Sequence, residues 1–419
     1  MILCDNKCKN NTYFSHFHNE ERVVNGLNRC DNYFIPHRNH IEIDDIISLR
    51  RVNTVPKNTK YIYQIPFRFY RIKSLTIPQT VSLFSLLLNI DNLINDINSG
   101  LCMLIFDEHA HSCVLTEDLV TRIDLCLSLI GIKKPVYILT CNSYNNNRHG
   151  KMFKTIHWEC YEAVAKSLQY KSDIKVQQKE KKRFLCLNLR QRMHRYFLLY
   201  KLCQIQKFKE NSILSLKPLD FSWLHSQPEY SMFKEHFGKL KNFVPFMKQL
   251  PFVTSYDVDK WPCKIRGERG NVYGDTVPEE MFLNSSIFIV TEKEYRYKED
   301  FLTVTEKTFK PISAKMPFII YGQPNVCKYL QTLGYKTFNT LWDETYDSIY
   351  DPILRGEEIV NLVKYLNAMD ERDFHDILQK SKDIVMHNYN HMHNRTLSAF
   401  FVDAVNGFFN KSYLCTDVS

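Results

Sequence analysis

The stretch Cys102-Met103-Leu104-Ile105-Phe106 is continuously apolar and stops at the polar sequence Asp107-Glu108-His109. A short unbroken apolar run is typical of a parallel strand that is buried on both faces. A helical pattern follows at residues 116–130, with Thr116 or a near neighbour placed to cap its first turn, and a second apolar run covers residues 136–140. Strands that alternate with helices in this way predict βαβ units around a parallel sheet.

The same alternation extends in both directions along the chain and then begins a second time. We expect further strands at residues 61–66, 184–187, 212–216, 287–290 and 317–321. The apolar spacing predicts helices at residues 81–97, 153–168, 193–205 and 305–315, and helices again beyond residue 356. Because the carboxyl ends of parallel strands share one edge of a sheet, Asp107, His109 and Asn142 are expected to lie together.

The length of 419 residues is enough for two domains of ordinary size. The charged segment at residues 171–182 is the best linker candidate. We assign residues 1–55 to an irregular polar arm, 56–172 to a first domain, 173–385 to a second domain and 386–419 to a helical tail.

The composition predicts a soluble protein of a reducing compartment. The 13 cysteines are scattered without any C-x-x-C pair, and several lie inside apolar runs, which favours free thiols in the cytoplasm. Neither a signal peptide nor a membrane span is expected. The net charge of +9 favours a polyanionic partner such as a nucleotide, a nucleic acid or an acidic membrane, or reflects only a basic surface.

The motif that points most directly to chemistry is Asp300-Phe301-Leu302-Thr303-Val304-Thr305-Glu306-Lys307-Thr308-Phe309-Lys310-Pro311-Ile312, which precedes the apolar run ending at Gly322. Thr305 is placed to cap a helix whose first turn carries Glu306 and Lys307. The first turn of a helix presents unpaired N–H groups and partial positive charge, so it can bind a diphosphate. A carboxylate there can bind ribose hydroxyls, and an ammonium group can reach a phosphate.

This motif resembles the donor-binding motif of the fucosyltransferase family and of related viral and phage-encoded glycosyltransferases. The similarity extends over residues 184–350, including residues 184–195, where a strand ends in a basic turn that opens a helix. It implies the GT-B architecture, in which two Rossmann-like domains face a cleft and the C-terminal one holds the nucleotide. The sequence departs from the pattern at Ala314-Lys315-Met316, where many relatives have a glycine.

The resemblance implies a donor site in the second domain. Glu306 would bind the ribose, while Lys307, Arg190 and Arg195 would neutralise the diphosphate as it leaves. The alternative from the residues alone is that Glu306 and Lys307 form an ion pair at the helix start. The arginines would then belong to a solvated face.

Other residues complete the predicted site. Glu292, which follows the strand at residues 287–290, would be a further donor-site carboxylate or an ordinary strand-end residue. Asn188 and Thr305 are assigned to the same donor site. In the first domain, Asp107 and His109 lie at a strand end, where a base could deprotonate an acceptor hydroxyl. Hydrogen bonding within the loop is the alternative for both, and a metal pair in the sequence His-Ala-His is a third.

Two other motifs resemble metal sites. Asp257-Val258-Asp259 is a D-x-D, which metal-dependent glycosyltransferases of another fold use, but the basic diphosphate site elsewhere argues against it. The tail motif His387-Asn388-Tyr389-Asn390-His391-Met392-His393 is either a metal site or a solvated helix face. We expect a nucleotide-sugar donor held by positive charge, with no metal and no other cofactor.

The sequence thus predicts a nucleotide-sugar-dependent glycosyltransferase (a hexosyl- or pentosyltransferase) of the cytoplasm, or of the host cytoplasm if the chain is viral. The acceptor would be a hydroxymethylated base in DNA, exposed by base flipping, or a glycan or protein. The alternative from another class is a non-catalytic nucleic-acid-binding protein. No P-loop or G-x-G-x-x-G motif occurs, which argues against a P-loop kinase and a dinucleotide dehydrogenase.

Overall fold

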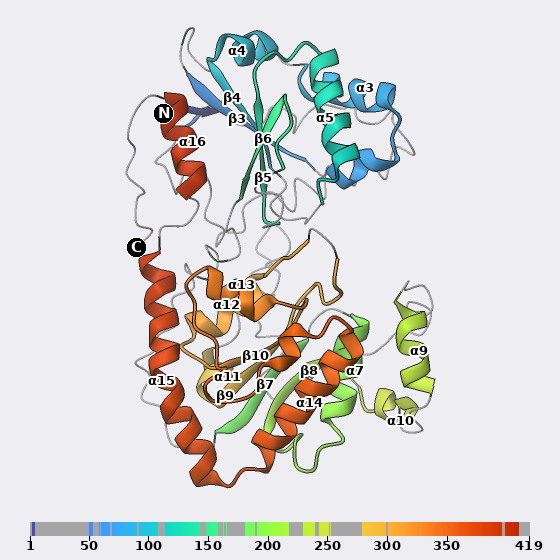
Figure 1. Cartoon of the computed structure of the whole chain (residues 1–419), viewed down its shortest axis with the longest axis vertical. Coiled ribbons are helices and arrows are strands. Elements are labelled where there is room, and N and C mark those ends of the chain that lie inside the picture. Colours follow the sequence, from blue (N-terminus) through green and yellow to red (C-terminus); the bar gives the residue numbers. More distant parts are fainter. Residues whose placement is uncertain are drawn as a thin grey trace.

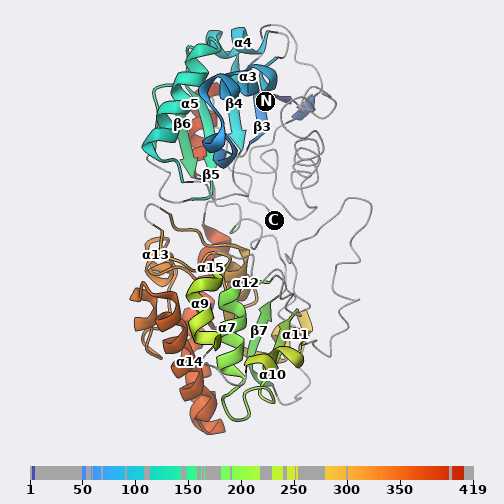
Figure 2. The same cartoon turned by 90° about the vertical axis from the view of Figure 1, so that its right-hand side faces the viewer.

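The computed structural model places the chain in two lobes, each built around a parallel β-sheet (Figures 1 and 2). The residues that it describes are 2–4, 50–52, 58, 60–67, 69–89, 92–107, 114–142, 148–157, 162, 165, 181–188, 191–217, 229–238, 243–250, 252, 279–298, 301–395 and 399–409. The predicted α/β class is confirmed, and the arrangement fits two Rossmann-like domains.

The first lobe contains a six-stranded sheet with the strand order β2-β1-β3-β4-β5-β6. The strands are β1 (Ile2–Cys4), β2 (Arg50–Val52), β3 (Tyr61–Pro66), β4 (Cys102–Asp107), β5 (Val136–Thr140) and β6 (Phe153–His157). The helical elements are η3 (Phe69–Ser74), α3 (Ile77–Leu87), α4 (Leu93–Ser99) and α5 (Glu117–Leu129). The expected irregular arm, residues 1–55, thus supplies two short strands, and its other residues lie outside the described ones.

The apolar runs and caps of this lobe behave as their sequence predicts. Every side chain from Cys102 to Phe106 is buried, and the side chain of Thr116 accepts a hydrogen bond from the N–H of Leu119 to start α5. Helices α3 and α5 pack together over the sheet, where Phe84 of α3 contacts Phe106 of β4 with ring centroids 5.6 Å apart. The buried face of each helix therefore covers the predicted strand.

Two helix predictions in this lobe are wrong. Residues 153–157, expected to begin a helix ending at 168, form β6, which pairs with β5 in parallel register. Phe153 is buried and Lys154 exposed, but this alternation is too short to be recognised as a strand from the sequence. In the rest of the expected helix, residues 162 and 165 are described, and both are helical. The helix expected at 81–97 is split into α3 and α4, because Asn92 adopts a left-handed backbone with φ of 63°.

The second lobe contains a four-stranded sheet with the order β10-β9-β7-β8. The strands are β7 (Lys182–Asn188), β8 (Ser212–Leu216), β9 (Ser285–Thr291) and β10 (Phe318–Tyr321), which confirms all four strand predictions. The helical elements are α7 (Met193–Leu202), α9 (Tyr230–Gly238), α10 (Phe243–Lys248), α11 (Glu279–Leu283), α12 (Glu306–Ser313), α13 (Val326–Thr332), η6 (Thr345–Ser348) and α14 (Pro352–Ala368). Helices α7 and α14 pack against each other.

The carboxyl end of the chain returns to the first lobe. Helix α15 (Glu371–Asn394) runs along the second lobe, and α16 (Ala399–Phe409) lies beside β6 of the first (Figure 1). There Lys60 Nζ donates to the Phe408 carbonyl at 2.6 Å. The expected boundary at residue 386 falls inside α15. None of the described helices combines the length and apolarity that crossing a membrane requires.

A buried ion pair lies where the chain crosses between the lobes. Glu162, only 1% exposed, belongs to the segment that joins β6 to β7. Its carboxylate accepts hydrogen bonds from the Arg395 guanidinium, just after α15, and from the Tyr335 hydroxyl. Burial and the charge of Glu162 raise the pKa of Tyr335, so this hydroxyl stays protonated and donates. The cluster therefore ties both crossing segments to the second lobe.

Replacing Arg395 by methionine should destabilise the protein by about 3 kcal/mol at neutral pH, because it leaves the Glu162 charge buried without its ionic partner. The double variant Glu162→Gln/Arg395→Met should recover part of that loss. Thermal unfolding measures both effects, with Lys380→Met as control because Lys380 pairs with Asp376 on the exposed side of α15. A loss no greater than that of the control would show that the cluster does not hold the crossings.

Candidate functional site

The carboxyl edges of the two sheets meet at the junction between the lobes. Asn142, which follows β5, is fully buried, and its Oδ1 accepts a hydrogen bond of 3.4 Å from the N–H of Leu302 in the second lobe. Strand β4 reaches the same edge at Asp107, which is in register with Leu139 of β5. The prediction that Asp107 and Asn142 share an edge is confirmed. The side chain of Asp107 and the whole of His109 lie outside the described part of the chain.

Helix α12 begins four residues beyond this contact, at Glu306. Thr305 is its N-cap, and the Thr305 side chain accepts a hydrogen bond from the N–H of Lys307. The side chains of Glu306 and Lys307 are 15% and 30% exposed, and Lys307 Nζ lies 2.6 Å from Glu306 Oε1. The predicted helix start is therefore confirmed, and its two charged residues pair with each other while remaining partly open to solvent.

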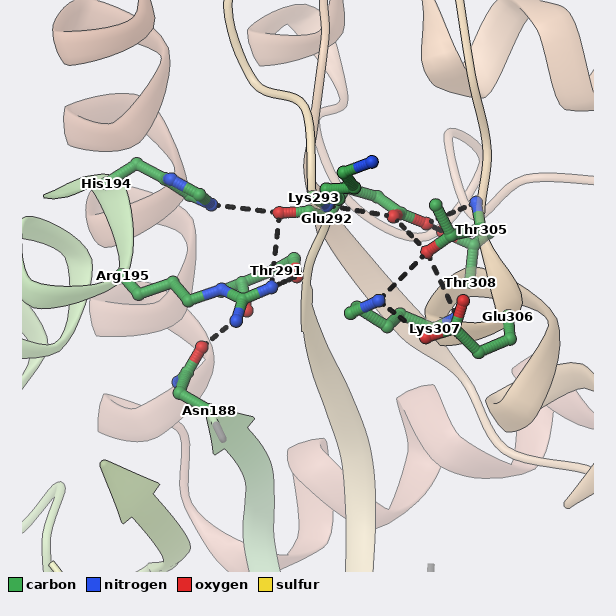
Figure 3. A network of polar contacts seen from close by, with 10 residues as sticks. All are labelled: Asn188, His194, Arg195, Thr291, Glu292, Lys293, Thr305, Glu306, Lys307 and Thr308. Carbon is green, nitrogen blue, oxygen red and sulfur yellow. Dashed lines mark hydrogen bonds and ion pairs between the residues drawn. The ribbon is translucent and has the colours of Figure 1, made fainter. Parts of the chain in front are cut away.

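The carboxylate of Glu292 meets the start of α12 from inside the protein (Figure 3). Glu292 is 0% exposed, and its Oε1 accepts hydrogen bonds from the Thr305 N–H at 3.0 Å and from Thr308 Oγ1 at 2.6 Å. Its Oε2 accepts another from Thr305 Oγ1. Donors at a helix N-terminus stabilise a negative charge. Glu292 therefore holds the helix start in place, and the carboxylate that remains partly exposed is Glu306.

On the other side, residues of α7 and β7 form hydrogen bonds with Thr291 and Glu292 at the end of β9 (Figure 3). His194 Nε2 donates to the Glu292 carbonyl at 3.0 Å, and the Arg195 guanidinium donates to the Thr291 carbonyl at 3.1 Å. Thr291 Oγ1 donates to Asn188 Oδ1 at 2.5 Å. The predicted residues Asn188, Arg195 and Glu292 are thus brought together, and all three bind groups of the protein itself.

Burial decides the protonation of the two residues that α7 contributes. It lowers the pKa of His194 well below its usual value, and the charge of Arg195 lowers it further. His194 is therefore neutral, donates through Nε2 and stacks on Tyr295 with ring centroids 4.1 Å apart. Burial, together with repulsion from Arg192, lowers the pKa of Arg195 to about 10, so Arg195 remains charged at neutral pH.

Two basic residues that were not predicted as site residues, Arg192 and Lys293, also lie near these charges. Burial lowers the pKa of Lys293; Glu294 opposes this effect, whereas the charges of Arg192 and Lys307 add to it. Figure 3 shows the Lys293 ammonium pointing away from the Glu292 network. We refer to Arg192, Arg195, Lys293 and Lys307 as the basic cluster.

Part of the basic cluster was visible in the sequence. Arg192 belongs to the basic turn before α7, and Lys293 is the second residue after the end of β9. Both are positions at which ligand-binding side chains of a parallel sheet occur. Arg190, predicted from the same turn, lies outside the described residues.

Glu306 supplies a permanent negative charge beside these cations. Burial alone would raise its pKa, but the charges of Lys307 and Lys310 outweigh it and lower the pKa to about 2. A carboxylate that stays ionised is an acceptor only, so it can bind hydroxyl groups of a ligand without changing its own protonation. The edge thus combines an ionised carboxylate, which could accept hydrogen bonds from hydroxyl groups, with cations that could bind phosphate.

The other polar motifs do not join this site. Asp257 and Asp259 lie outside the described residues. His387 and His391 project from α15 to bond the carbonyls of Gly334 and Leu333, at 3.0 and 2.7 Å, at the end of α13. His387 and His391 therefore take part in packing α15 against the end of α13, a role that neither interpretation of the sequence motif included. In the described part of the chain, no group of three or more potential metal ligands is present.

The fold and the site together define a two-lobed α/β protein with parallel sheets and a basic edge where the lobes meet. No protein-family model and no curated protein sequence matches the chain. The function has to be inferred from the residues at this edge.

Replacing Glu292 by glutamine should destabilise the protein by about 2–3 kcal/mol, because one acceptor would become an amide facing hydroxyl and N–H donors. Hydrogen exchange at the start of α12 should increase as well. Glu294→Gln is the matched control, since Glu294 lies two residues away and pairs with Lys298 near the surface. Equal thermal stability of the two variants would contradict the anchoring role of Glu292.

Proposed function

We propose that this protein is a glycosyltransferase of the GT-B type that binds a nucleotide-sugar donor at the start of α12. The observation that carries the proposal is the basic cluster beside Glu306, at the edge where the two lobes meet. The charge of Arg192 contributes to lowering the pKa of Arg195 and of Lys293, and an anionic ligand would relieve that repulsion. A diphosphate joined to a ribose has both groups that this pairing of charges would recognise.

The proposed roles follow from charge and exposure. Glu306 accepts hydrogen bonds from the ribose hydroxyls, and Lys307, next to it and partly exposed, neutralises the diphosphate. Lys293 and Arg192 add positive potential, whereas Arg195 acts mainly by holding the main chain of β9. One correctly placed donor contributes about 3 kcal/mol to stabilising the charge that develops as such a leaving group departs.

In the proposed reaction, an acceptor oxygen forms a bond to the anomeric carbon while the bond from that carbon to the diphosphate breaks. The hydroxyl proton passes to a base at the carboxyl edge of the first lobe, for which Asp107 and His109 remain our candidates. The donor is held by side-chain charge, without a metal. We propose a hydroxymethylated DNA base as the acceptor, and a glycan or protein hydroxyl as the alternative.

The experiment is a panel of nucleotide sugars incubated with the protein, with and without DNA that contains hydroxymethylated bases, measuring the nucleoside diphosphate released. Release from one donor, stimulated by its acceptor, is expected. If the protein binds DNA in a salt-sensitive manner and releases nucleoside diphosphate from none of the donors, the nucleic-acid-binding alternative is correct.

Glu306→Ala should weaken donor binding roughly 10- to 100-fold, because it removes a charged hydrogen-bond acceptor. Lys307→Ala should lower kcat about 100-fold, because its charge matters most when the leaving group is fully formed. With the pKa of Glu306 at about 2, donor affinity should not titrate through this residue between pH 5 and 9. Lys328→Ala, on the exposed side of α13, is the control; an equal loss in that variant would contradict both roles.

A further inference from the structure

A second concave surface lies at the other edge of the second-lobe sheet. It is a hollow of about 490 Å³ formed where β7, β9 and β10 begin, between the end of α12 and the side of α15. The candidate functional site lies where the same strands end. Sites for small organic molecules commonly enclose ~300–1,000 Å³, so this hollow is large enough for one.

Lysines are the charged residues of this hollow. Lys181 precedes β7, Lys315 follows α12 and Lys382 projects from α15, so they come from three separate elements. Among the described residues that line the hollow, there is no aspartate or glutamate. Three lysines and no acidic residue give this described part of the lining a positive charge, which attracts an anion.

The rest of the lining is largely apolar. Phe282, Met316 and Val385 are each less than 10% exposed and line the hollow from α11, from the segment before β10 and from α15. These side chains would exclude water from an apolar group placed against them. A simple inorganic ion could satisfy the lysines but would leave this surface wet.

Lys315 can be replaced without disturbing the local backbone. Its backbone is left-handed, with φ of 51°, and its Nζ lies 4.3 Å from the centre of the Tyr389 ring on α15. Glycine adopts this backbone conformation without strain. Lys315→Gly therefore removes the ammonium group and keeps the local turn, so the variant is expected to fold.

We infer that this hollow binds a small amphipathic anion, with a phosphate or carboxylate head among the lysines and an apolar body against Phe282, Met316 and Val385. The inference stands apart from the proposed glycosyltransferase activity, because it rests on other residues at the opposite edge of the sheet. A nucleoside monophosphate and a medium-chain fatty acid are two sources of this shared chemistry.

Calorimetric titration of the full chain with AMP, decanoate and inorganic phosphate tests the inference. We expect saturable binding of AMP or decanoate, and the one that binds identifies the source of the ligand. Lys315→Gly and Lys382→Met should each weaken it roughly tenfold, the effect of losing one charged hydrogen bond. Lys380→Met, on the same helix but paired with Asp376, should leave the affinity unchanged.

Three results would overturn the inference. The first is that neither AMP nor decanoate binds at millimolar concentration. The second is that inorganic phosphate binds as tightly as the organic probes, which would remove the role of the apolar surface. The third is that binding survives Lys315→Gly but is lost in Lys307→Ala, which would place the anion at the candidate functional site instead.

Discussion

Glu292 places a negative charge in the interior of the second lobe, and the groups around it are arranged to hold that charge. A buried carboxylate is costly unless several donors satisfy it. Here the donors come from the first turn of α12, while the carbonyl of the same residue accepts from α7. One residue therefore joins β9, α12 and α7, and the positions of Glu306 and Lys307 depend on it.

The same segment connects the two lobes. Leu302 donates to Asn142 of the first lobe, and Thr305, three residues later, donates to Glu292. A shift of one lobe against the other would therefore act directly on the start of α12. The chain crosses between the lobes twice, and the ion pair of Glu162 with Arg395 holds both crossings next to the second lobe. The basic edge is thus fixed both by its own hydrogen bonds and by the way the chain joins the lobes.

Local features of the sequence predicted most strands, the cap at Thr116 and the start of α12, because a buried apolar run and an N-cap are each encoded by adjacent residues. Features that depend on distant partners were not predictable in this way. Residues 153–157 become β6 because β5 offers them a free edge. Likewise, Glu292 looks like an exposed strand-end carboxylate until α12 folds over it.

The arrangement of the basic cluster favours a compact anion over an extended one. Arg192 and Lys307 each lie close enough to Lys293 for their charges to lower its pKa. A nucleic acid backbone is bound more effectively by cations spread along a groove, each meeting a different phosphate. Arg195 is almost wholly buried and donates to a carbonyl, so it acts mainly within the protein. A diphosphate concentrates its charge over a short distance, which is why we propose a nucleotide rather than a long polyanion as the ligand of this cluster.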